Sequence, residues 1–483
     1  MNILNSCKPE NVFGIFEEIC SIPHGSYNLD EIRAYIIDFA ERAGIEYTAD
    51  AYGNIILRKP ATEGYEDKPG IVLQAHMDMV AVCEDGSGID MKTTPPEIFT
   101  EGDMIGARGT SLGGDDGIGV AMALAILDSV VISHPALEVI ITANEETGME
   151  GAKGLDMSLI KGRQLINLDS EDEGIFTVGC AGGARVKCYI PADSEAAVTS
   201  SQDTFLEIRI SGLKGGHSGT EIHLGRGNAS KLMGRLTGST SVHGRSAVIH
   251  DVKGGNADNA IPADCMVRLS LPSSDIEGFI GCIKKEAAVI KSELSKTDPG
   301  FTVNISVSGN TDPGLCMSLM NFTSFINSLP NGIIAMSGEV EGIVETSLNL
   351  GILKIEGDRL VAEFAVRSSV DSEKDALIKR LQSLTEGFGG TNTVTGVYPG
   401  WKYAPESPLR DRMVRVFREM YGHDPKVEAI HAGLECGWFM SKAPDIDAVS
   451  IGPDMQSVHS TSERLSVSST ERVYEYLLKV LAD

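Results

Sequence analysis

The chain contains 483 residues, which is enough for two or three domains of about 150 residues each. Asp and Glu (68) outnumber Lys and Arg (41), so the formal net charge is −27, and a surface this acidic disfavours a nucleic-acid partner because it repels phosphate backbones. With 42% hydrophobic and 23% charged residues and no long apolar stretch, the sequence is that of a folded chain without a membrane span.

The N-terminal residues and the cysteines favour the cytoplasm. Lys8, Glu10 and Glu17 lie where a secretory signal peptide carries its apolar run. The nine cysteines are odd in number and none lies in a C-x-x-C pair, a pattern typical of free thiols in a reducing compartment. We therefore expect a cytoplasmic protein that has neither a membrane nor a nucleic-acid partner.

The first part of the chain alternates between helical and strand patterns. The expected helices are 9–20, 29–44 and 118–127, and the expected strands are 47–57 (two short strands), 71–75, 137–142 and 164–168. Such alternation predicts an α/β fold, with a mostly parallel sheet flanked by helices on both faces.

The pattern changes after Asp169, where glycine-rich turns and polar, alternating strands begin. Long helices return near Val397, followed by one more apolar strand at 448–451. We therefore expect one α/β domain, made of residues 1–185 and 396–483, to be interrupted by an α+β domain over residues 186–395.

The inserted domain carries a weak internal similarity. Residues 265–282 and 360–378 each read as a strand, a serine-rich turn and a helix. Two similar halves would explain the size of the insert, and a chance similarity explains the pattern equally well.

Five acidic or imidazole motifs follow apolar strands or open a helix. In chain order they contain His76 and Asp78, Asp115 and Asp116, Glu145 and Glu146, Asp169, and His459. Ligands of open α/β sheets bind beyond the carboxyl ends of the strands. Each motif alone has an ordinary explanation, such as a surface pair, a helix cap or a solvated face. Their combination at strand ends favours a metal site.

The residue types indicate which chemistry such a site performs. Two imidazoles and three carboxylates suit two divalent ions about 3.5–4 Å apart, and they come from His76, Asp115, Glu146, Asp169 and His459. This donor set favours zinc, with manganese or cobalt as alternatives. Asp78 is expected to orient the His76 ring, and Glu145 is the candidate general base.

The motifs resemble those of a known family. The strings LQAHMDMV, RGTSLGGDDGIG, NEETGMEGAKGL, NLDSEDEG, GLKGGHSGTEIH, NAIP, HAGLECG and SIGP…VHS resemble the aminoacyl-histidine dipeptidases, also called cytosolic non-specific dipeptidases. These are co-catalytic zinc peptidases related to acetylornithine deacetylase, and the resemblance runs from about residue 10 to the C-terminus. It implies a catalytic α/β domain interrupted by a lid domain, and hydrolysis of dipeptides with a free N-terminus, including Xaa-His dipeptides such as carnosine.

The resemblance also implies roles for individual metal-site residues. His76 and Asp169 would bind one zinc, Glu146 and His459 the other, with Asp115 as the bridge, Asp78 as the residue that orients His76, and Glu145 as the base that deprotonates water. One position departs from the family pattern, because Asp116 stands where the family has Asn after the bridging aspartate. This leaves open whether Asp116 perturbs the bridge.

The resemblance also implies four residues that contact the substrate, three of them in the lid and the fourth, Gly433, in the segment that follows it. His217 would hydrogen-bond the tetrahedral oxyanion, and Arg367 would pair with the terminal carboxylate of the substrate. Asn259 would hold that carboxylate or the peptide, and Gly433 would present backbone to the substrate. Without the resemblance, a turn residue before Pro262 explains Asn259 equally well.

Two alternative functions remain open at this stage. An N-acyl amino acid deacylase would use the same dinuclear site on a substrate whose amine is acylated. A non-catalytic binding module would keep the fold, but it has no use for a base such as Glu145 beside the metals. The expected partner is a dipeptide substrate, and the oligomeric state is a homodimer or a monomer.

Overall fold

The computed structural model describes residues 3–192, 203–240, 244, 246–308 and 317–483, and the chain divides into two compact units. Unit 1 contains Met1–Cys180, Trp401–Ala429 and Leu434–Asp483, and unit 2 contains Ala181–Gly400 and Ile430–Gly433. The units therefore change after residues 180 and 400, where the sequence suggested 185 and 395. The inclusion of 430–433 in unit 2 was not anticipated, and the catalytic and lid roles of these ranges stay predictions.

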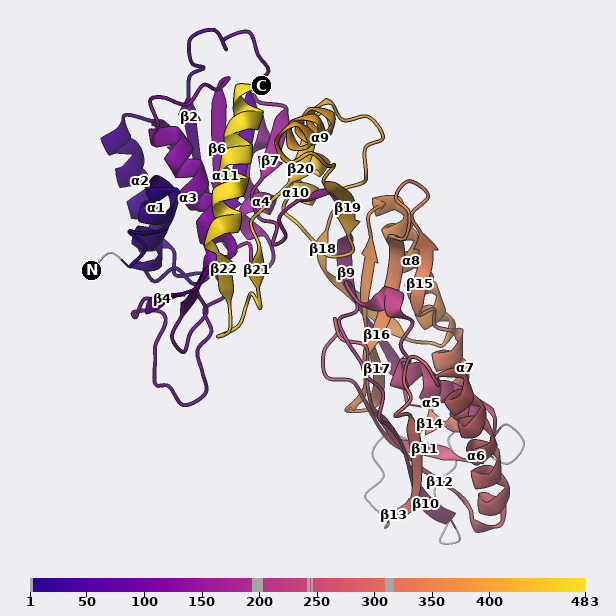
Figure 1. The fold of residues 1–483 in the computed structure, drawn as a ribbon. Helices are drawn as coiled ribbons and strands as arrows, with labels where there is room; N and C mark the ends of the chain where they lie inside the picture. The colour runs from indigo at the N-terminus through magenta and orange to yellow at the C-terminus, as the bar shows by residue number, and fades with distance from the viewer. Residues whose placement is uncertain (1–2, 193–202, 241–243, 245, 309–316) are drawn as a thin grey trace. The chain divides into compact units, whose positions relative to one another are not determined.

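Unit 1 is built on an eight-stranded sheet (Figure 1). In sheet order its strands are β1 (Glu46–Ala49), β2 (Ile55–Lys59), β6 (Leu137–Thr142), β3 (Ile71–His76), β7 (Gln164–Asn167), β20 (Asp447–Ser450), β8 (Ile175–Cys180) and β19 (Lys426–Ile430). The four central strands β6, β3, β7 and β20 run parallel, whereas β1–β2, β2–β6 and β20–β8 pair antiparallel. The predicted α/β sheet is thus confirmed, with its parallel part at the centre.

Helices cover both faces of this sheet. They are α1 (Glu10–Cys20), α2 (Asp30–Ala43), α3 (Gly114–Asp128), α4 (Glu150–Gly154), α9 (Pro408–Tyr421), α10 (Cys436–Lys442) and α11 (Val467–Ala482). Alternate residues of β3, such as Leu73, share one buried apolar cluster with α1, α2, α3, α9 and α11. The other face meets the segment that enters α10, since Gln74 of β3 hydrogen-bonds Glu435. The connection between α4 and β7 contains the 3-10 turn η1 (Met157–Leu159).

A second, four-stranded sheet in unit 1 supports the segment that carries His459. Its order is β21 (Met455–Gln456), β22 (Arg464–Ser466), β5 (Met104–Ala107) and β4 (Ile98–Glu101). β21 and β22 pair antiparallel, and the turn between them contains His459. β22 also pairs with β5, which precedes the loop that carries Asp115.

Unit 2 contains two halves with the same element order. The first half is β10 (Asp203–Ser211), α5 (Ala229–Gly238), β11 (Val248–Gly254), β12 (Cys265–Pro272), α6 (Ile276–Glu293) and β13 (Thr302–Ser308). The second is β9 (Gly182–Pro191), α7 (Leu319–Ser328), β16 (Val344–Glu356), β17 (Arg359–Ser368), α8 (Asp371–Gly387) and β18 (Thr391–Tyr398). The sheet runs β13-β10-β12-β11-β16-β17-β9-β18, so each half places its first strand between its third and fourth.

This order bears out the internal similarity seen in the sequence. Both segments that suggested it, β12 with α6 and β17 with α8, occupy equivalent positions in the two halves. The halves join where β11 pairs antiparallel with β16, at Lys253 opposite Lys354. Two short strands, β14 (Met317–Ser318) and β15 (Gly332–Met336), pair with β11 and β16, and η2 (Ile222–Leu224) and η3 (Ser273–Asp275) are 3-10 turns.

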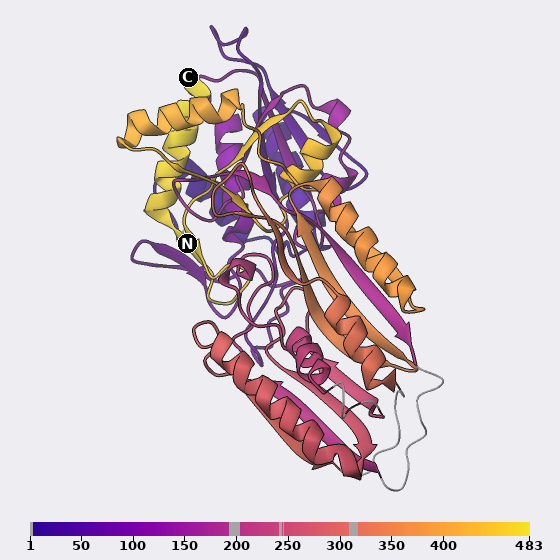
Figure 2. The same ribbon diagram turned by 90° about the vertical axis from the view of Figure 1, so that its right-hand side faces the viewer.

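The helices of unit 2 lie along one face of its sheet (Figures 1 and 2). Residues of α5, α6, α7 and α8 share one buried cluster with alternate residues of the strands, for example Val267 of β12 and Phe364 of β17. In the described part of the chain, no helix is both long and apolar enough to cross a membrane. The eight cysteines in that part are all free thiols.

Close packing at the end of β20 predicts that residue 452 must be glycine. A Cβ atom on Gly452 would overlap the backbone carbonyl of Ser170, the residue after Asp169. We expect Gly452→Ala to lower the free energy of unfolding by about 1–3 kcal/mol, because the backbone beyond β7 must shift. Thermal unfolding measures this effect.

A matched control is Gly14→Ala in the middle of α1, where the added methyl would meet nothing within 4 Å. This change should raise stability by about 0.5–1 kcal/mol, because Ala favours the helix. Equal unfolding temperatures for the two variants would contradict the packing argument.

Candidate metal and catalytic site

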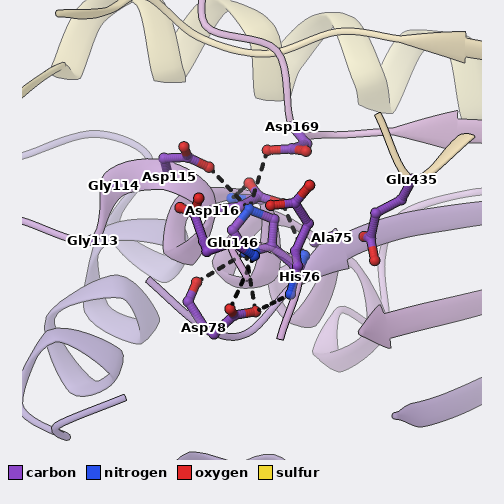
Figure 3. Close-up of polar contacts among 12 residues, drawn as sticks. Ala75, His76, Asp78, Gly113, Gly114, Asp115, Asp116, Glu146, Asp169 and Glu435 are labelled. Atoms are coloured by element: carbon purple, nitrogen blue, oxygen red, sulfur yellow. Dashed lines mark hydrogen bonds and ion pairs between the residues drawn. The ribbon is translucent and has the colours of Figure 1, made fainter. Parts of the chain in front are cut away.

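The residues expected to bind metal converge at the carboxyl edge of the parallel strands (Figure 3). His76 is the last residue of β3, Asp169 lies two residues after β7, and Glu146 follows β6. Asp115 lies in the first turn of α3, and His459 lies in the turn between β21 and β22. Side chains far apart in the sequence therefore meet in one place within unit 1.

Asp115 stands at the centre of this group. Its Oδ1 lies 3.0 Å from His76 Nε2, and its Oδ2 lies 3.0 Å from His459 Nε2. His76 Nε2 is also 3.4 Å from Asp169 Oδ1, and His459 Nε2 is 3.0 Å from Glu146 Oε1. The Asp115 carboxylate thus lies between two similar pairs and contacts the imidazole of each. One pair is His76 with Asp169, and the other is His459 with Glu146.

Asp78 lies behind His76 and is almost completely buried. Its Oδ1 lies 3.6 Å from His76 Nδ1, and its backbone oxygen lies 2.9 Å from the same nitrogen. Asp78 also accepts the backbone N–H groups of Glu145 (2.9 Å) and Glu146 (3.3 Å), and the Ser26 hydroxyl (2.8 Å). Asp78 therefore contacts both the His76 ring and the backbone of the segment that carries the candidate base.

Asp116 has a different environment from Asp115. Its carboxylate is fully buried and accepts the N–H of His76 at 3.1 Å and the N–H of Gly119 at 3.1 Å. One oxygen therefore accepts from the backbone of β3 and the other from the backbone of α3, and of the two aspartates Asp115 is the one that contacts both imidazoles. An oxygen of Asp116 nevertheless lies within 4.8 Å of ligand atoms of His76 and Asp169.

The cluster concentrates acidic groups in a buried place. Hydrogen bonds to the carboxylates of Asp115 and Glu146 raise the pKa of His459 to about 11. Burial raises the pKa of Asp169 to about 8, and it also raises the pKa of Glu145 well above its usual range. Because the pKa values of Asp169 and Glu145 are raised, nearby positive charge would favour the ionised form of both carboxyl groups.

The donor set fits divalent cations. In the described residues, potential ligand atoms form three groups, and within each group they lie within 4.8 Å of one another. The groups are His76 with Asp116 and Asp169, His76 with Glu145 and Glu146, and Asp115 with Glu146 and His459. Glu146 Oε1 is buried and lies 3.0 Å from His459 Nε2, a spacing that allows the two atoms to bind the same cation. Mixed imidazole and carboxylate donors suit zinc, manganese and cobalt.

A layer of buried polar side chains lies one step below the metal edge, and the sequence reasoning missed it. Gln74 donates to Glu435 Oε2 and accepts from Asn167, both at 2.6 Å, and Thr142 also donates to Glu435 at 2.6 Å. Ser450 in turn donates to Asn167. The detectable signal is the polar Gln74 and Asn167, each two residues before a ligand, inside otherwise apolar strands.

Unit 2 brings together three of the four residues expected to contact substrate. His217 forms a β-bridge with Ala260, next to Asn259, whose backbone oxygen accepts the N–H of Ser218 at 2.8 Å. A Cβ atom on Gly219 would lie 2.9 Å from His217 and 3.2 Å from the guanidinium carbon of Arg367. The fourth residue, Gly433, belongs to the segment 430–433 of the same unit.

The hydrogen bonds of His217 define which ring nitrogen carries the proton. The backbone N–H of Thr220 donates to His217 Nδ1 at 3.1 Å, so that nitrogen is an acceptor. Burial and the charge of Arg367 lower the pKa of His217, which favours the neutral ring. The neutral ring therefore carries its hydrogen on Nε2 and can donate it to an anionic oxygen.

Arg367 has unused donor capacity. Its Nη1 donates to the Tyr398 hydroxyl at 3.3 Å, and its buried Nε has no acceptor among the described residues. A buried guanidinium N–H without an acceptor costs free energy unless a ligand supplies one. The planar guanidinium suits a carboxylate in particular.

Comparison with known proteins relates the whole chain to peptidases. The sequence profile of peptidase family M20/M25/M40 matches residues 72–483. The cytosol non-specific dipeptidase of Escherichia coli (strain K12) is 36% identical over 484 aligned residues, which cover 100% of this chain and 99% of that protein. The family resemblance inferred from the sequence motifs is therefore confirmed.

Solved structures agree with this relationship. The crystal structure of aminoacylhistidine dipeptidase from Vibrio alginolyticus has a TM-score of 0.92 at 35% identity and covers 99% of this chain and 97% of that chain. Aminopeptidase PepT from Bacillus cereus, at 17% identity, has a TM-score of 0.57 and covers 99% of this chain and 98% of that chain. The second similarity concerns the fold alone.

The environment of His431 in unit 2 predicts a pH dependence of stability. Burial and the charge of Arg367 lower the pKa of His431 to about 4, and its Nε2 lies 2.7 Å from the Ser347 hydroxyl. The unfolded chain binds this proton below about pH 6.5, whereas the folded chain does not until about pH 4. The stabilisation due to neutral His431 is therefore present above pH 6.5 and is lost as the pH falls toward 4.

We expect wild-type protein to lose about 2 kcal/mol more than His431→Gln between pH 7 and pH 5, because the variant lacks this titration. Urea unfolding of both proteins at the two pH values measures the difference. If the difference in stability between the two proteins did not change with pH, the lowered pKa assigned to His431 would be ruled out.

Proposed function

The chain belongs to peptidase family M20/M25/M40, and on this premise we propose that it is a metal-dependent dipeptidase that cleaves dipeptides with a free N-terminus, Xaa-His dipeptides among them. The observation that carries the proposal is the contact of one carboxylate, Asp115, with two imidazoles through its two oxygens. The names of the Escherichia coli and Vibrio alginolyticus relatives support the dipeptide as substrate and, for the former, the cytosol as location.

We assign the residues of unit 1 to two divalent ions, with zinc as the expected metal. His76 and Asp169 would hold one ion, Glu146 and His459 the other, and Asp115 both. When bound, such a pair supplies positive charge that lowers the pKa of water and stabilises a developing oxyanion. Because Asp116 is engaged by backbone N–H groups, it supports the loop and leaves the bridging role to Asp115.

Glu145 is the proposed general base. Its carboxyl group is next to the proposed ligand Glu146, and burial raises its pKa, which makes the carboxylate a stronger proton acceptor. Glu145 would take a proton from the attacking water and return it to the amine nitrogen that leaves when the peptide bond breaks. Asp78 would fix the position of Glu145 relative to the His76 ring, because it contacts both segments.

The residues of unit 2 have proposed roles in substrate recognition. His217 would donate its Nε2 hydrogen to the oxyanion of the tetrahedral intermediate. Arg367 would form a bidentate pair with the terminal carboxylate of the dipeptide. This role fits its positive charge and the Nε donor that has no acceptor among the described residues. Asn259 is proposed to hold the carboxylate or the peptide, and Gly433 is proposed to present its backbone to the substrate.

A small substrate panel tests the function. Metal-stripped protein would be reloaded with zinc, manganese or cobalt and assayed on Ala-His, β-Ala-His, Leu-Gly, a tripeptide and an N-acetyl amino acid. We expect metal to restore cleavage of the free dipeptides only. Cleavage of the N-acetyl substrate alone would assign the site to a deacylase, and no cleavage with any metal would contradict the proposal.

Replacement of the proposed base separates catalysis from metal binding. Glu145→Gln removes the proton acceptor but keeps the size of the side chain, so we expect kcat to fall by about 10²–10⁴-fold. Metal content, measured by elemental analysis, should stay at that of the wild type because Glu145 is not an assigned ligand. Full turnover in the variant would overturn the assignment.

A further inference from the structure

Glu463 is a buried carboxylate in the turn between β21 and β22, four residues after His459, and it is only 3% exposed. It accepts four backbone N–H groups from a single loop. Oε2 accepts from Leu112 (2.8 Å) and Gly113 (3.2 Å), and Oε1 accepts from Gly114 (2.8 Å) and Asp115 (3.4 Å). An ionised carboxylate suits this position, because it has acceptor sites only.

The loop is shaped closely around this carboxylate. Gly113 has a φ of +76°, in the left-handed region that favours glycine, and this conformation helps turn successive N–H groups toward one point. A Cβ atom on Gly114 would lie 3.2 Å from Glu463 Oε1, so only a very small residue fits without displacement. The loop and the carboxylate are therefore complementary in shape and in charge.

The other end of Glu463 is tied to the turn that carries His459. Its backbone N–H donates to the Ser460 carbonyl at 3.2 Å, and the Ser460 hydroxyl donates to the Ser457 carbonyl at 2.6 Å. His459 itself has a φ of +60°, which is strained for a residue with a side chain. The turn thus holds its histidine in a conformation that depends on surrounding contacts.

Glu463 therefore connects the two segments whose side chains meet at the 3.0 Å contact between Asp115 and His459. Resting on the function proposed above, we propose that Glu463 is a positioning residue for the metal centre. It holds the backbone of Asp115 where one carboxylate oxygen reaches His76 and the other reaches His459. It does not act on substrate, since backbone N–H groups occupy both of its oxygens.

Glu463→Gln tests this role. The amide keeps one acceptor oxygen but turns an NH₂ group toward backbone N–H donors, so about half of the contacts are lost. Metal-free protein would be titrated with Co²⁺ and followed by its visible absorption, which reports ligand geometry independently of activity. We expect the Kd for cobalt to rise by about 10- to 100-fold, the spectrum to change, and kcat to fall with little change in KM.

Glu138→Gln is the matched control. Glu138 is also buried, and its Oε2 accepts the N–H groups of Lys161 (2.8 Å) and Gly162 (2.7 Å). It lies near the start of β6, at the opposite end of the strand from the metal edge. This variant should lose stability, as any variant that breaks such contacts does, but keep the wild-type cobalt affinity and spectrum.

The outcomes separate positioning from general stability. If Glu463→Gln loses stability like the control while its cobalt affinity and spectrum match those of wild type, the inference is wrong. If Glu463→Gln does not fold, Gly114→Ala provides the same test, since it presses on Oε1 without changing charge. It should weaken cobalt binding, and unchanged binding would overturn the inference. If the wild-type protein bound no cobalt, the proposed function would be contradicted, and the role of Glu463 as a positioning residue would fail together with it.

Discussion

The contact of Asp115 with both His76 and His459 is the constraint on which the rest of unit 1 depends. It requires several carboxylates to lie close together in a buried place, where they repel one another and lose hydration. Three further buried carboxylates hold the backbone around this cluster in place. Asp78, Asp116 and Glu463 each accept backbone N–H groups from segments that carry the candidate ligands or lie beside them.

The carboxylates that bind backbone explain why the site contains more acidic residues than two metal ions would need as ligands. One group of carboxylates lies among the candidate metal ligands, and the other group accepts backbone N–H groups. The sheet contributes a third layer, since Gln74 and Asn167 hydrogen-bond across neighbouring parallel strands two residues before His76 and Asp169. Because parallel strands end at one edge, a polar layer under that edge fixes several ligands at once.

Unit 2 contributes groups of a different electrostatic character. Its candidate residues include the Arg367 guanidinium and the His217 imidazole, whose pKa is lowered by burial and by the charge of Arg367, in contrast to the acidic cluster of unit 1. Positive charge and N–H donors are what an anionic substrate end and a developing oxyanion require. The two similar halves of unit 2 build one continuous sheet through β11 and β16. Arg367 lies on β17, which pairs antiparallel with β16 and β9.

Much of this could be predicted from local sequence. The strand at 71–75, the helix at 118–127 and the repeated strand-turn-helix pattern in the insert are all present in the structure, because apolar periodicity and turn residues act over short distances. The same holds for the residue types of the metal site, since a strand followed at once by His or Asp is visible in the sequence. The family motifs added the order of those residues and their expected roles.

Only the tertiary structure decided which carboxylate meets which partner. Asp115 and Asp116 are neighbours in the sequence, yet one contacts two imidazoles and the other contacts backbone N–H groups. Glu463 gave no signal, because its partners at 112–115 lie about 350 residues away and are backbone groups that every residue possesses. The sequence by itself determined the local elements and the donors of the site. Their pairing depended on long-range packing, because the N–H groups that bind these carboxylates belong to the backbone and not to particular side chains.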